Sequence, residues 1–379
     1  PIPLIAETGG QNAMIVDSSA LTEQVVIDVV SSAFDSAGQR CSALRVLCLQ
    51  EDSADRVIEM LKGAMAESRL GNPERLSVDI GPVIDAEAKS GIEKHIQGMR
   101  EKGRSVYQVA LANAEECKRG TFVMPTLIEL ESFDELKREI FGPVLHVLRY
   151  NRKDLDQLIE QINASGYGLT LGVHTRIDET IAKVIDNVHA GNVYVNRNIV
   201  GAVVGVQPFG GEGLSGTGPK AGGPLYLYRL LSTRPADAIE QSFQRSDAGN
   251  TPDSRLREAL LKPFEAFKAW AASKQQSELV QTCEQFACQS QSGVTRLLAG
   301  PTGERNSYTI LPREHVLCLA DNEADLLTQL AAVLAVGSSA VVLDGEPGKS
   351  VRSHLPKEVQ ARIKLVSDWN KEDVAFDAV

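Results

Sequence analysis

Helix-like and strand-like segments alternate along the first half of the chain, and this alternation admits few folds. Residues 18–34 place apolar side chains on one face of a helix, and residues 44–49 form a short apolar, β-prone run. The same order recurs, with helices predicted over 54–67, 86–102, 154–162 and 178–188 and strands over 144–148, 169–174 and 193–196. Such alternation favours an α/β domain around a largely parallel sheet.

The composition changes twice farther along the chain, and these changes divide it. Residues 201–224 are rich in glycine and predict a structured loop, whereas residues 232–252 are polar and predict a linker. Beyond the linker, a helix is predicted over 254–272, a strand over 315–320, a helix over 323–336 and a strand over 340–343. We therefore expect one domain over residues 1–245 and a second α/β unit over residues 246–379.

The overall composition is that of an ordinary globular protein, 43% hydrophobic over 379 residues. Its formal net charge of −11 would repel phosphate backbones, so nucleic acid is not an expected partner. No apolar run reaches the roughly 20 residues that span a bilayer, and no signal peptide opens the chain. These features predict a cytoplasmic location.

The six cysteines lack the paired spacings of a zinc site or a disulfide framework, and we expect at least five to be buried thiols. Cys48 and Cys318 lie in apolar strands and belong to the core. Cys41 differs, because it lies in a helix-to-strand connection beside Arg40, which could lower the pKa of its thiol. Cys41 is therefore the candidate nucleophile, although most free cysteines are small buried residues.

A carboxylate near the N-terminus has a matching candidate role. Glu7 is followed by Gly9 and Gly10, which let the backbone approach another group closely. Beside an acyl-thioester, such a carboxylate would take a proton from the attacking water. Taken alone, Glu7 could equally be a surface residue.

Six segments together resemble the aldehyde dehydrogenase superfamily, and they occur in the order of that family: AETGGQN (6–12), GQRCSA (38–43), EIFGPVL (139–145), GYGLTLGVHTR (166–176), GNVYVNR (191–197) and PFGGEGLSGTG (208–218). The continuation SGTGPKAGGPLYL (215–227) resembles the branch that oxidises glutamate-γ-semialdehyde, the open form of pyrroline-5-carboxylate. Residues 295–313 resemble the C-terminal region of bifunctional bacterial enzymes of proline utilization.

This resemblance implies the roles of four residues. Cys41 would be the nucleophile that forms a thioester with the substrate, and Glu7 would be the base that activates the hydrolytic water. Glu139 would accept hydrogen bonds from the nicotinamide ribose of NAD, and Phe141 would pack nearby. Without the motif around it, Glu139 would be taken for a surface carboxylate at a helix end.

The resemblance also suggests which groups bind the small-molecule substrate. We expect the hydroxyl of Ser42 and the backbone amides of Gly211 and Glu212 to bind its carboxylate, because glycines allow such amides to converge. The acidic side chain of Glu212 should point away from this anion, or else the register is off by one residue. Phe209 could line the path of the aldehyde.

Other parts of the larger enzymes would be absent from this piece. Only six residues precede Glu7, so the N-terminal Rossmann domain that binds NAD is expected to be missing, and the fragment to be inactive alone. FAD would belong only to the absent proline dehydrogenase domain. The second unit would be a truncated aldehyde dehydrogenase-like fold that covers a substrate tunnel. The parent enzyme is expected to be a homo-oligomer.

Two alternatives remain open. The chain could be an inactive module for oligomerisation and tunnel covering, with its site residues present but idle. It could also be a thiol hydrolase in which Cys41 is paired with His174 or His189, although neither histidine lies in a recognisable partner motif.

Overall fold

A computed structural model describes residues 4–110, 117–233, 235, 237–238, 254–371 and 374–379. The chain divides into two compact units, residues 1–234 and residues 235–379. The boundary expected at residue 245 lies in the segment 239–253, outside the described residues. Each unit is described separately below.

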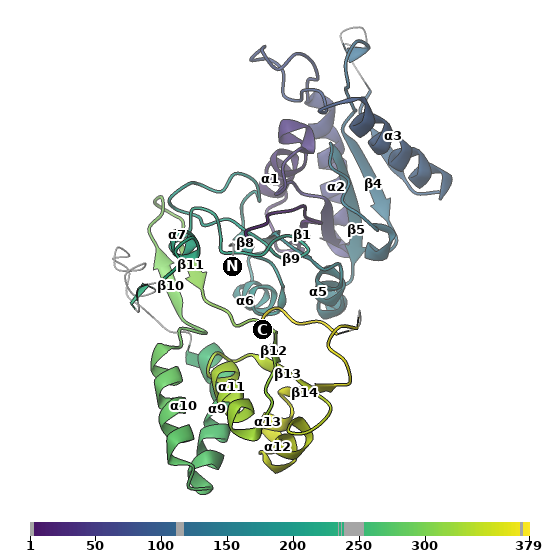
Figure 1. Ribbon diagram of the computed structural model, residues 1–379. Coiled ribbons are helices and arrows are strands. Elements are labelled where there is room, and N and C mark those ends of the chain that lie inside the picture. Colours follow the sequence, from purple (N-terminus) through teal and green to yellow (C-terminus); the bar gives the residue numbers. More distant parts are fainter. Residues whose placement is uncertain (1–3, 111–116, 234, 236, 239–253, 372–373) are drawn as a thin grey trace. The chain divides into compact units, whose positions relative to one another are not determined.

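The first unit is built on a seven-stranded sheet with the strand order β3-β4-β5-β2-β1-β7-β8. Figure 1 labels β1, β4, β5 and β8 of this sheet. The strands are β1 (Ala13–Val16), β2 (Val46–Gln50), β3 (Val106–Gln108), β4 (Thr126–Leu130), β5 (Val144–Tyr150), β7 (Thr170–His174) and β8 (Asn192–Val195). Neighbouring strands are parallel except for β3, which pairs antiparallel with β4. The predicted parallel α/β architecture is therefore confirmed.

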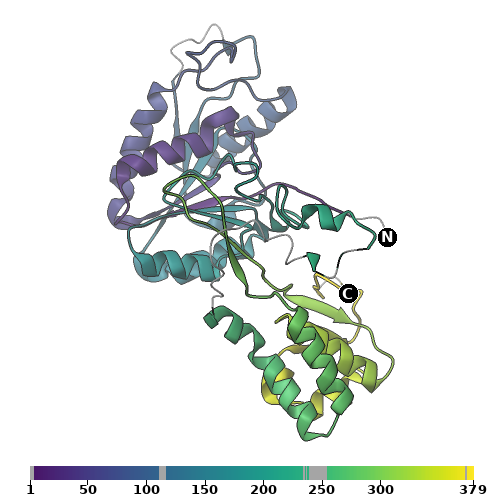
Figure 2. The ribbon, with the colours of Figure 1, turned by 90° about the vertical axis from the view of Figure 1, so that its left-hand side faces the viewer.

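Helices cover both faces of this sheet (Figure 2). They are α1 (Thr22–Phe34), α2 (Glu51–Glu67), α3 (Ala86–Glu101), α5 (Leu155–Ala164) and α6 (Asp178–Asn187). The short α7 (Tyr226–Arg229) follows the Gly-rich loop. The chain runs from β1 to β2 in one direction across the sheet, and from β5 through β7 to β8 in the other. Because crossovers between parallel strands are right-handed, α1 and α2 lie on one face and α5 and α6 on the other.

The register of the central strands aligns their starting points. Ala13 of β1 pairs with Val46 of β2 and with Leu171 of β7, and Val46 pairs with His146 of β5. Since these strands are parallel, the segments that precede them all arrive at one edge of the sheet, here called the amino edge. The opposite edge, where the strands end, is called the carboxyl edge.

The second unit contains a parallel sheet in the order β12-β13-β14, which confirms the predicted strand, helix and strand pattern. Its strands are β12 (His315–Cys318), β13 (Ser339–Leu343) and β14 (Ile363–Val366), with a separate hairpin of β10 (Thr295–Leu298) and β11 (Asn306–Thr309). Its helices are α9 (Ser254–Ser273), α10 (Ser277–Gln289), α11 (Glu323–Ala335), α12 (Gly348–His354) and α13 (Lys357–Gln360).

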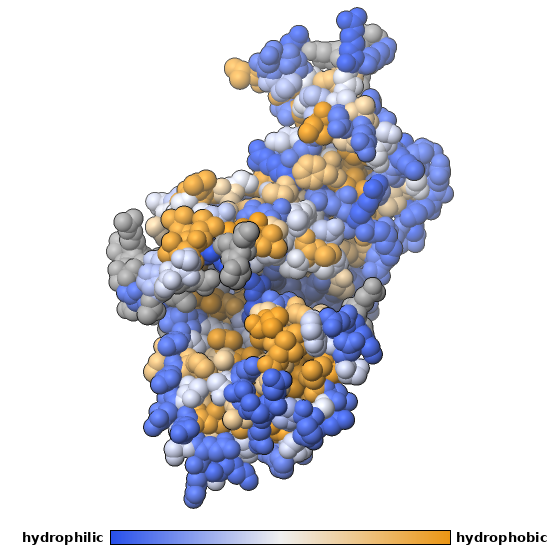
Figure 3. Space-filling view, viewed as in Figure 1, coloured by the Kyte–Doolittle hydropathy of each residue, from blue (hydrophilic) through white to orange (hydrophobic). Residues whose placement is uncertain are grey.

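The two faces of this smaller sheet are packed differently. One face carries Cys318 and Val342 into a core formed with the helices, whereas the alternating residues Leu317 and Val341 face Trp369 and its apolar neighbours. Figure 3 shows apolar side chains at the surface over β12 to β14. No helix in the described part of the chain is long and apolar enough to cross a membrane.

The cysteines differ in part from expectation. Cys48, Cys117, Cys283 and Cys318 are buried, as predicted for core thiols. Cys288, however, is exposed near the end of α10, so the expectation of five buried thiols is wrong. Cys41 is also exposed, as a candidate nucleophile requires.

Candidate active site

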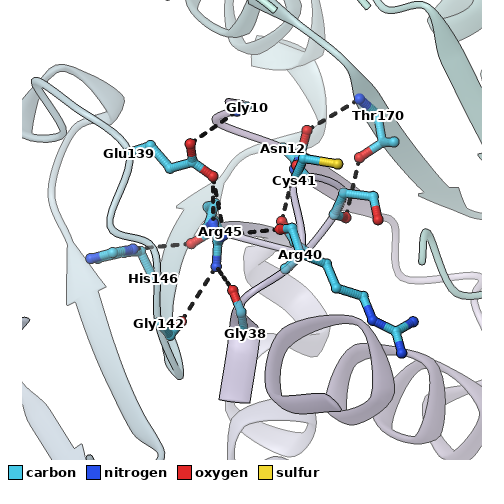
Figure 4. A network of polar contacts seen from close by, with 12 residues as sticks. Gly10, Asn12, Gly38, Arg40, Cys41, Arg45, Glu139, Gly142, His146 and Thr170 are labelled. Atoms are coloured by element: carbon cyan, nitrogen blue, oxygen red, sulfur yellow. Dashed lines mark hydrogen bonds and ion pairs between the residues drawn. The ribbon is translucent and has the colours of Figure 1, made fainter. Parts of the chain in front are cut away.

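The amino edge of the first sheet gathers most of the residues singled out from the sequence. Glu7 precedes β1, Cys41 precedes β2, and Glu139 and Phe141 precede β5. The Gly-rich loop joins them because its strand β9 (Glu212–Gly213) pairs with β6 (Tyr167–Gly168), directly before β7. Segments that are far apart in the sequence therefore meet at one place, and Figure 4 shows Asn12, Cys41 and Glu139 there together with Thr170 of β7.

The backbone around Cys41 is held by a buried amide. Asn12 Nδ2 donates to the carbonyl oxygens of Cys41, at 2.7 Å, and Ala43, at 2.9 Å. Asn12 Oδ1 accepts from the backbone N–H of Thr170 at 3.1 Å (Figure 4). The side chain of Asn12 thus connects the nucleophile turn to the start of β7.

The pKa of the Cys41 thiol is raised, so this thiol keeps its proton to a higher pH than an ordinary thiol does. Burial raises its pKa, and the negative charges of Glu7 and Glu139 raise it further, against the backbone N–H groups of Ser42 and Cys41, which lower it. The expectation that Arg40 lowers this pKa is wrong. The Arg40 side chain points away from the thiol (Figure 4), and its Nε donates to Ser36 Oγ at 3.1 Å.

Glu7 is fixed through its backbone rather than through its carboxylate. It forms an antiparallel bridge with Gly216, and the neighbouring Thr8 N–H donates to Ser215 O at 3.1 Å. The side chain is exposed and lies near enough to Cys41 to influence its titration. A carboxylate in this place can act on a water molecule beside the thiol.

Glu139 is not a surface carboxylate at a helix end. Its side chain is 14% exposed and forms an ion pair with Arg45, from Nη2 to Oε1 at 3.0 Å. Its other oxygen, Oε2, accepts from Gly10 N at 3.2 Å. The ring of Phe141 is 44% exposed and lies against the Arg45 guanidinium, 5.0 Å from its centroid.

The four substrate-binding candidates do not share one environment. Ser42 is buried, and its carbonyl oxygen accepts from Thr170 Oγ1 at 3.4 Å. Phe209 is half-buried and pairs with Ala221 across the Gly-rich loop. Gly211 is packed against Gly168 and Ser215, and Glu212 is exposed opposite Gly168. Their role in substrate recognition stays a prediction.

A lysine that the sequence reading missed anchors this loop. Lys220 Nζ donates to Gly191 O, to Gly210 O at 2.9 Å and to Asn192 Oδ1 at 3.3 Å. Burial lowers its pKa to about 8, although the nearby carboxylates of Glu212 and Glu7 favour its charged form. Lys220 therefore ties the loop to the start of β8.

Two histidines lie behind the nucleophile turn. His146 Nδ1 lies 3.0 Å from Arg45 O, and its Nε2 lies 2.9 Å from His95 Nε2. Burial lowers the pKa of His146 to about 3 and that of His95 to about 4. Both imidazoles are neutral at physiological pH, so one donates its single ring hydrogen to the other.

His174 lies at the opposite edge of the sheet from Cys41. It ends β7, is buried, and its Nε2 lies 3.5 Å from Asp28 Oδ2. A cleft of about 360 Å³ opens at the same carboxyl edge, lined by residues that include Asp17, Tyr150 and Lys183. A pairing of Cys41 with His174 is therefore wrong.

Arg45, Asn12 and Lys220 are the polar residues that the sequence reading overlooked. Each left a signal, because each is a polar residue inside or next to an apolar or Gly-rich run. Arg45 is the clearest case, since it interrupts the apolar run that leads into β2. A buried strand that begins with a cation predicts a buried partner of opposite charge.

Comparisons with known proteins give consistent matches. The model of the aldehyde dehydrogenase family matches residues 2–234. The bifunctional protein PutA of Klebsiella aerogenes is 66% identical over 382 residues, covering 100% of this chain and 29% of that protein. The 1-pyrroline-5-carboxylate dehydrogenase of Bacillus cereus (strain B4264) is 38% identical over 227 residues, 59% of this chain and 43% of that protein.

A solved structure agrees with these matches. The crystal structure of a bifunctional proline utilization A (PutA) protein has 55% sequence identity and a TM-score of 0.57, and covers 60% of this chain and 23% of that chain. This chain therefore spans less than a third of the PutA proteins that it resembles.

Proposed function

Because the chain belongs to the aldehyde dehydrogenase family, we propose that it supplies the catalytic residues for oxidising glutamate-γ-semialdehyde to glutamate. One observation carries this proposal. The amino edge places an exposed thiol, Cys41, within electrostatic reach of two carboxylates, Glu7 and Glu139. A nucleophile and a base are both needed for an acyl-enzyme route.

Cys41 acts first, by adding its sulfur to the aldehyde carbon. The raised pKa of the resting thiol means that its proton must leave as the substrate binds, and the N–H groups of Ser42 and Cys41 favour the resulting thiolate. Loss of hydride then leaves a thioester on Cys41. Glu7 takes a proton from water, which attacks the thioester and releases the carboxylate product.

The residues present fit a nicotinamide dinucleotide. We propose that Glu139 accepts hydrogen bonds from its ribose hydroxyls and that the exposed ring of Phe141 packs against it. Arg45 and Gly10 fix both carboxylate oxygens of Glu139 and leave part of the group exposed, so it is preorganised as an acceptor. When bound, NAD would supply the hydride acceptor.

The choice of substrate rests on the relatives named for pyrroline-5-carboxylate and on the Gly-rich loop. We propose that Ser42 and the amides of Gly211 and Glu212 recognise the substrate carboxylate, with Phe209 along its path. The attraction between Lys220 and Glu212 supports a Glu212 side chain directed at the lysine rather than at an anion. We propose that FAD is used only by a proline dehydrogenase domain that lies outside this chain.

We also propose that the chain alone turns over little or no aldehyde, since it spans 43% of the single-function relative and 29% of the bifunctional one. The second unit, residues 246–379 as delimited from the sequence, is proposed to cover a substrate tunnel in a homo-oligomeric parent. These roles rest on the resemblance and need the longer protein for their test.

The test compares NADH formation from pyrroline-5-carboxylate by this chain and by a chimaera. In the chimaera, the chain is joined at its N-terminus to the preceding region of the Klebsiella aerogenes PutA, with which it shares 66% identity. We expect the chimaera to form NADH and its Cys41→Ala variant to lose at least about a thousandfold in kcat, as losses of nucleophiles do.

The matched control is Cys288→Ser, which removes the other exposed thiol and should leave the rate unchanged. A Cys41→Ala chimaera that keeps its activity would overturn the mechanism. A chimaera that folds but forms no NADH would favour the alternative of a non-catalytic, tunnel-covering module.

A further inference from the structure

Arg45 is the most completely buried charged side chain near the candidate site, with 1% of its side chain exposed. It lies directly before β2, four residues after Cys41, and its side chain is closed off from solvent. A buried guanidinium is costly unless every N–H group has a partner. The partners of Arg45 therefore indicate its purpose.

All five N–H groups of the guanidinium have an acceptor within hydrogen-bonding distance. Nη1 donates to Gly38 O at 2.7 Å and to Gly142 O at 3.3 Å. Nη2 donates to Arg40 O at 3.1 Å, and both Nη2 and Nε donate to Glu139 Oε1, at 3.0 and 3.3 Å. Figure 4 shows Arg45 at the centre of this network.

One set of these bonds holds a strained turn. Ser36, Ala37 and Gly38 have φ values of 56°, 54° and 66°, three consecutive residues in the left-handed region that non-glycine residues avoid. This conformation persists only where the surroundings enforce it. The bonds from Arg45 to the carbonyl oxygens of Gly38 and Arg40 enclose the end of the turn, immediately before Cys41.

The other set of bonds fixes the residue proposed to bind the cofactor. Glu139 Oε1 is held by Arg45, and Oε2 is held by Gly10 N, three residues after Glu7. A Cβ at Gly9 would lie 2.0 Å from Glu139 Oε2, so the backbone approaches this carboxylate as closely as glycine allows. One guanidinium thus joins the nucleophile turn, Glu139 and the segment that carries the base.

We propose that Arg45 is a positioning residue that sets the geometry and charge of the Cys41 turn and, through the same guanidinium, the position of the Glu139 carboxylate. This inference rests on the proposed function, since it assigns Cys41 and Glu139 to one reaction. The positions of Cys41 and Glu139 are then coupled through Arg45. Displacing Glu139 changes the turn, and changing the turn displaces Glu139.

The test measures the rate of alkylation of Cys41 by iodoacetamide from about pH 6 to pH 10, the range in which a cysteine thiol titrates. The chain carries Cys288→Ser, so that Cys41 is its exposed thiol, and mass spectrometry identifies the labelled peptide. The variants are Arg45→Met, Arg45→Lys and, as a matched control, Arg104→Met. Arg104 also binds two carboxylates, those of Glu131 and Glu135, in the same unit.

In Arg45→Met the negative charge of Glu139 is no longer offset by a cation, and that charge raises the pKa of Cys41. We therefore expect the midpoint of the profile to rise by about one pH unit, which slows alkylation at pH 8 about tenfold. Arg45→Lys keeps the cation but has three N–H donors for five contacts. Its profile should therefore lie between that of the chain with Arg45 and that of Arg45→Met. Arg104→Met should leave the profile unchanged. A purely structural Arg45 would lower stability without moving the profile, and that result overturns the proposal.

If Arg45→Met does not fold, Arg45→Lys decides the question, because an unaltered profile in that variant also overturns the proposal. The assay uses neither NAD nor aldehyde, so its outcome is separate from that of the NADH test. A silent chimaera with shifted Arg45 profiles would reject the proposed function and keep the positioning role. An active chimaera with unshifted profiles would support the proposed function and reject the positioning role of Arg45.

Discussion

The two edges of the first sheet each bury an acidic side chain beside a basic one, but only the pair at the amino edge is fully hydrogen-bonded. At the amino edge, Arg45 and Glu139 are 3.0 Å apart, and each has further backbone partners. At the carboxyl edge, His174 Nε2 and Asp28 Oδ2 are 3.5 Å apart, and neither of these buried atoms has a hydrogen-bond partner among the described residues.

The titration of the two pairs differs accordingly. Burial raises the pKa of Asp28 and lowers that of His174, so this pair tends toward neutral groups. For Arg45, burial lowers the pKa, but the charge and hydrogen bonds of Glu139 oppose that effect. A buried charge is retained where a network of donors and acceptors compensates it, and the amino edge has that network.

The largest expected effect comes from breaking the amino-edge pair. Arg45→Met removes the guanidinium donors from the Glu139 carboxylate and from three carbonyl groups and leaves the buried carboxylate without its cation, so it should lower the free energy of unfolding by about 3 kcal/mol or more. Urea denaturation followed by circular dichroism measures this change. A loss well below 1 kcal/mol would show that the buried pair at the amino edge contributes no more to stability than the pair at the carboxyl edge.

A smaller loss should follow from crowding the same pair. Gly9→Ala places a methyl group against Glu139 Oε2 and should lower the free energy of unfolding by about 2 kcal/mol, as overpacking does. The control is Gly63→Ala within α2, where a Cβ meets nothing within 4 Å, and which should gain roughly 0.5–1 kcal/mol. Equal effects at both glycines would contradict the close approach.

The histidines behind Arg45 predict an acid-dependent loss of stability. The folded-state pKa of His146 is about 3, below the ordinary value of 6.5, so the unfolded chain binds more protons between these limits. Stability is therefore complete above pH 6.5 and falls progressively toward pH 3. His146→Gln should reduce this loss by roughly 2 kcal/mol at pH 5, measured by urea denaturation at several pH values. An unchanged pH dependence would exclude the burial of a neutral imidazole.

The smallest effect is expected at the carboxyl edge. Asp28→Asn removes a charge that raises the pKa of His174, so this pKa should fall further, as followed by NMR titration. Because the pair tends toward neutrality, the free energy of unfolding should fall by less than about 1 kcal/mol. A loss as large as that of Arg45→Met would mean that the His174–Asp28 pair is ionised.

Most of the fold could be predicted from the sequence because apolar periodicity is strong in both units. The predicted strand at 44–49 appears as Val46–Gln50, and the predicted helix at 178–188 as Asp178–Asn187. Strands β1, β3 and β4 were not predicted, and the three residues of β3 are too few for a pattern. Cys288 was misjudged because burial was inferred from residue type.

The candidate residues could be named from motifs, but their environment could not. Burial determined the direction in which the pKa of Cys41 shifts, and adjacency in sequence pointed to Arg40, whereas the fold places the guanidinium of Arg45 against the turn. Contacts such as Asn12 with Thr170 join residues 158 positions apart, which no local pattern reveals. Long-range polar contacts depend on how the strands pack in the sheet, and a local sequence pattern does not reveal that packing.

These long-range contacts also order the events of synthesis. Cys41 and Arg45 emerge from the ribosome well before Glu139, which follows Arg45 by 94 residues, and before Thr170. Until β5 and β7 have joined the sheet, the guanidinium lacks the carboxylate of Glu139 and the side chain of Asn12 lacks its bond to Thr170. A nascent chain therefore carries an ordinary cysteine, and the arranged nucleophile exists only after the first sheet is nearly complete.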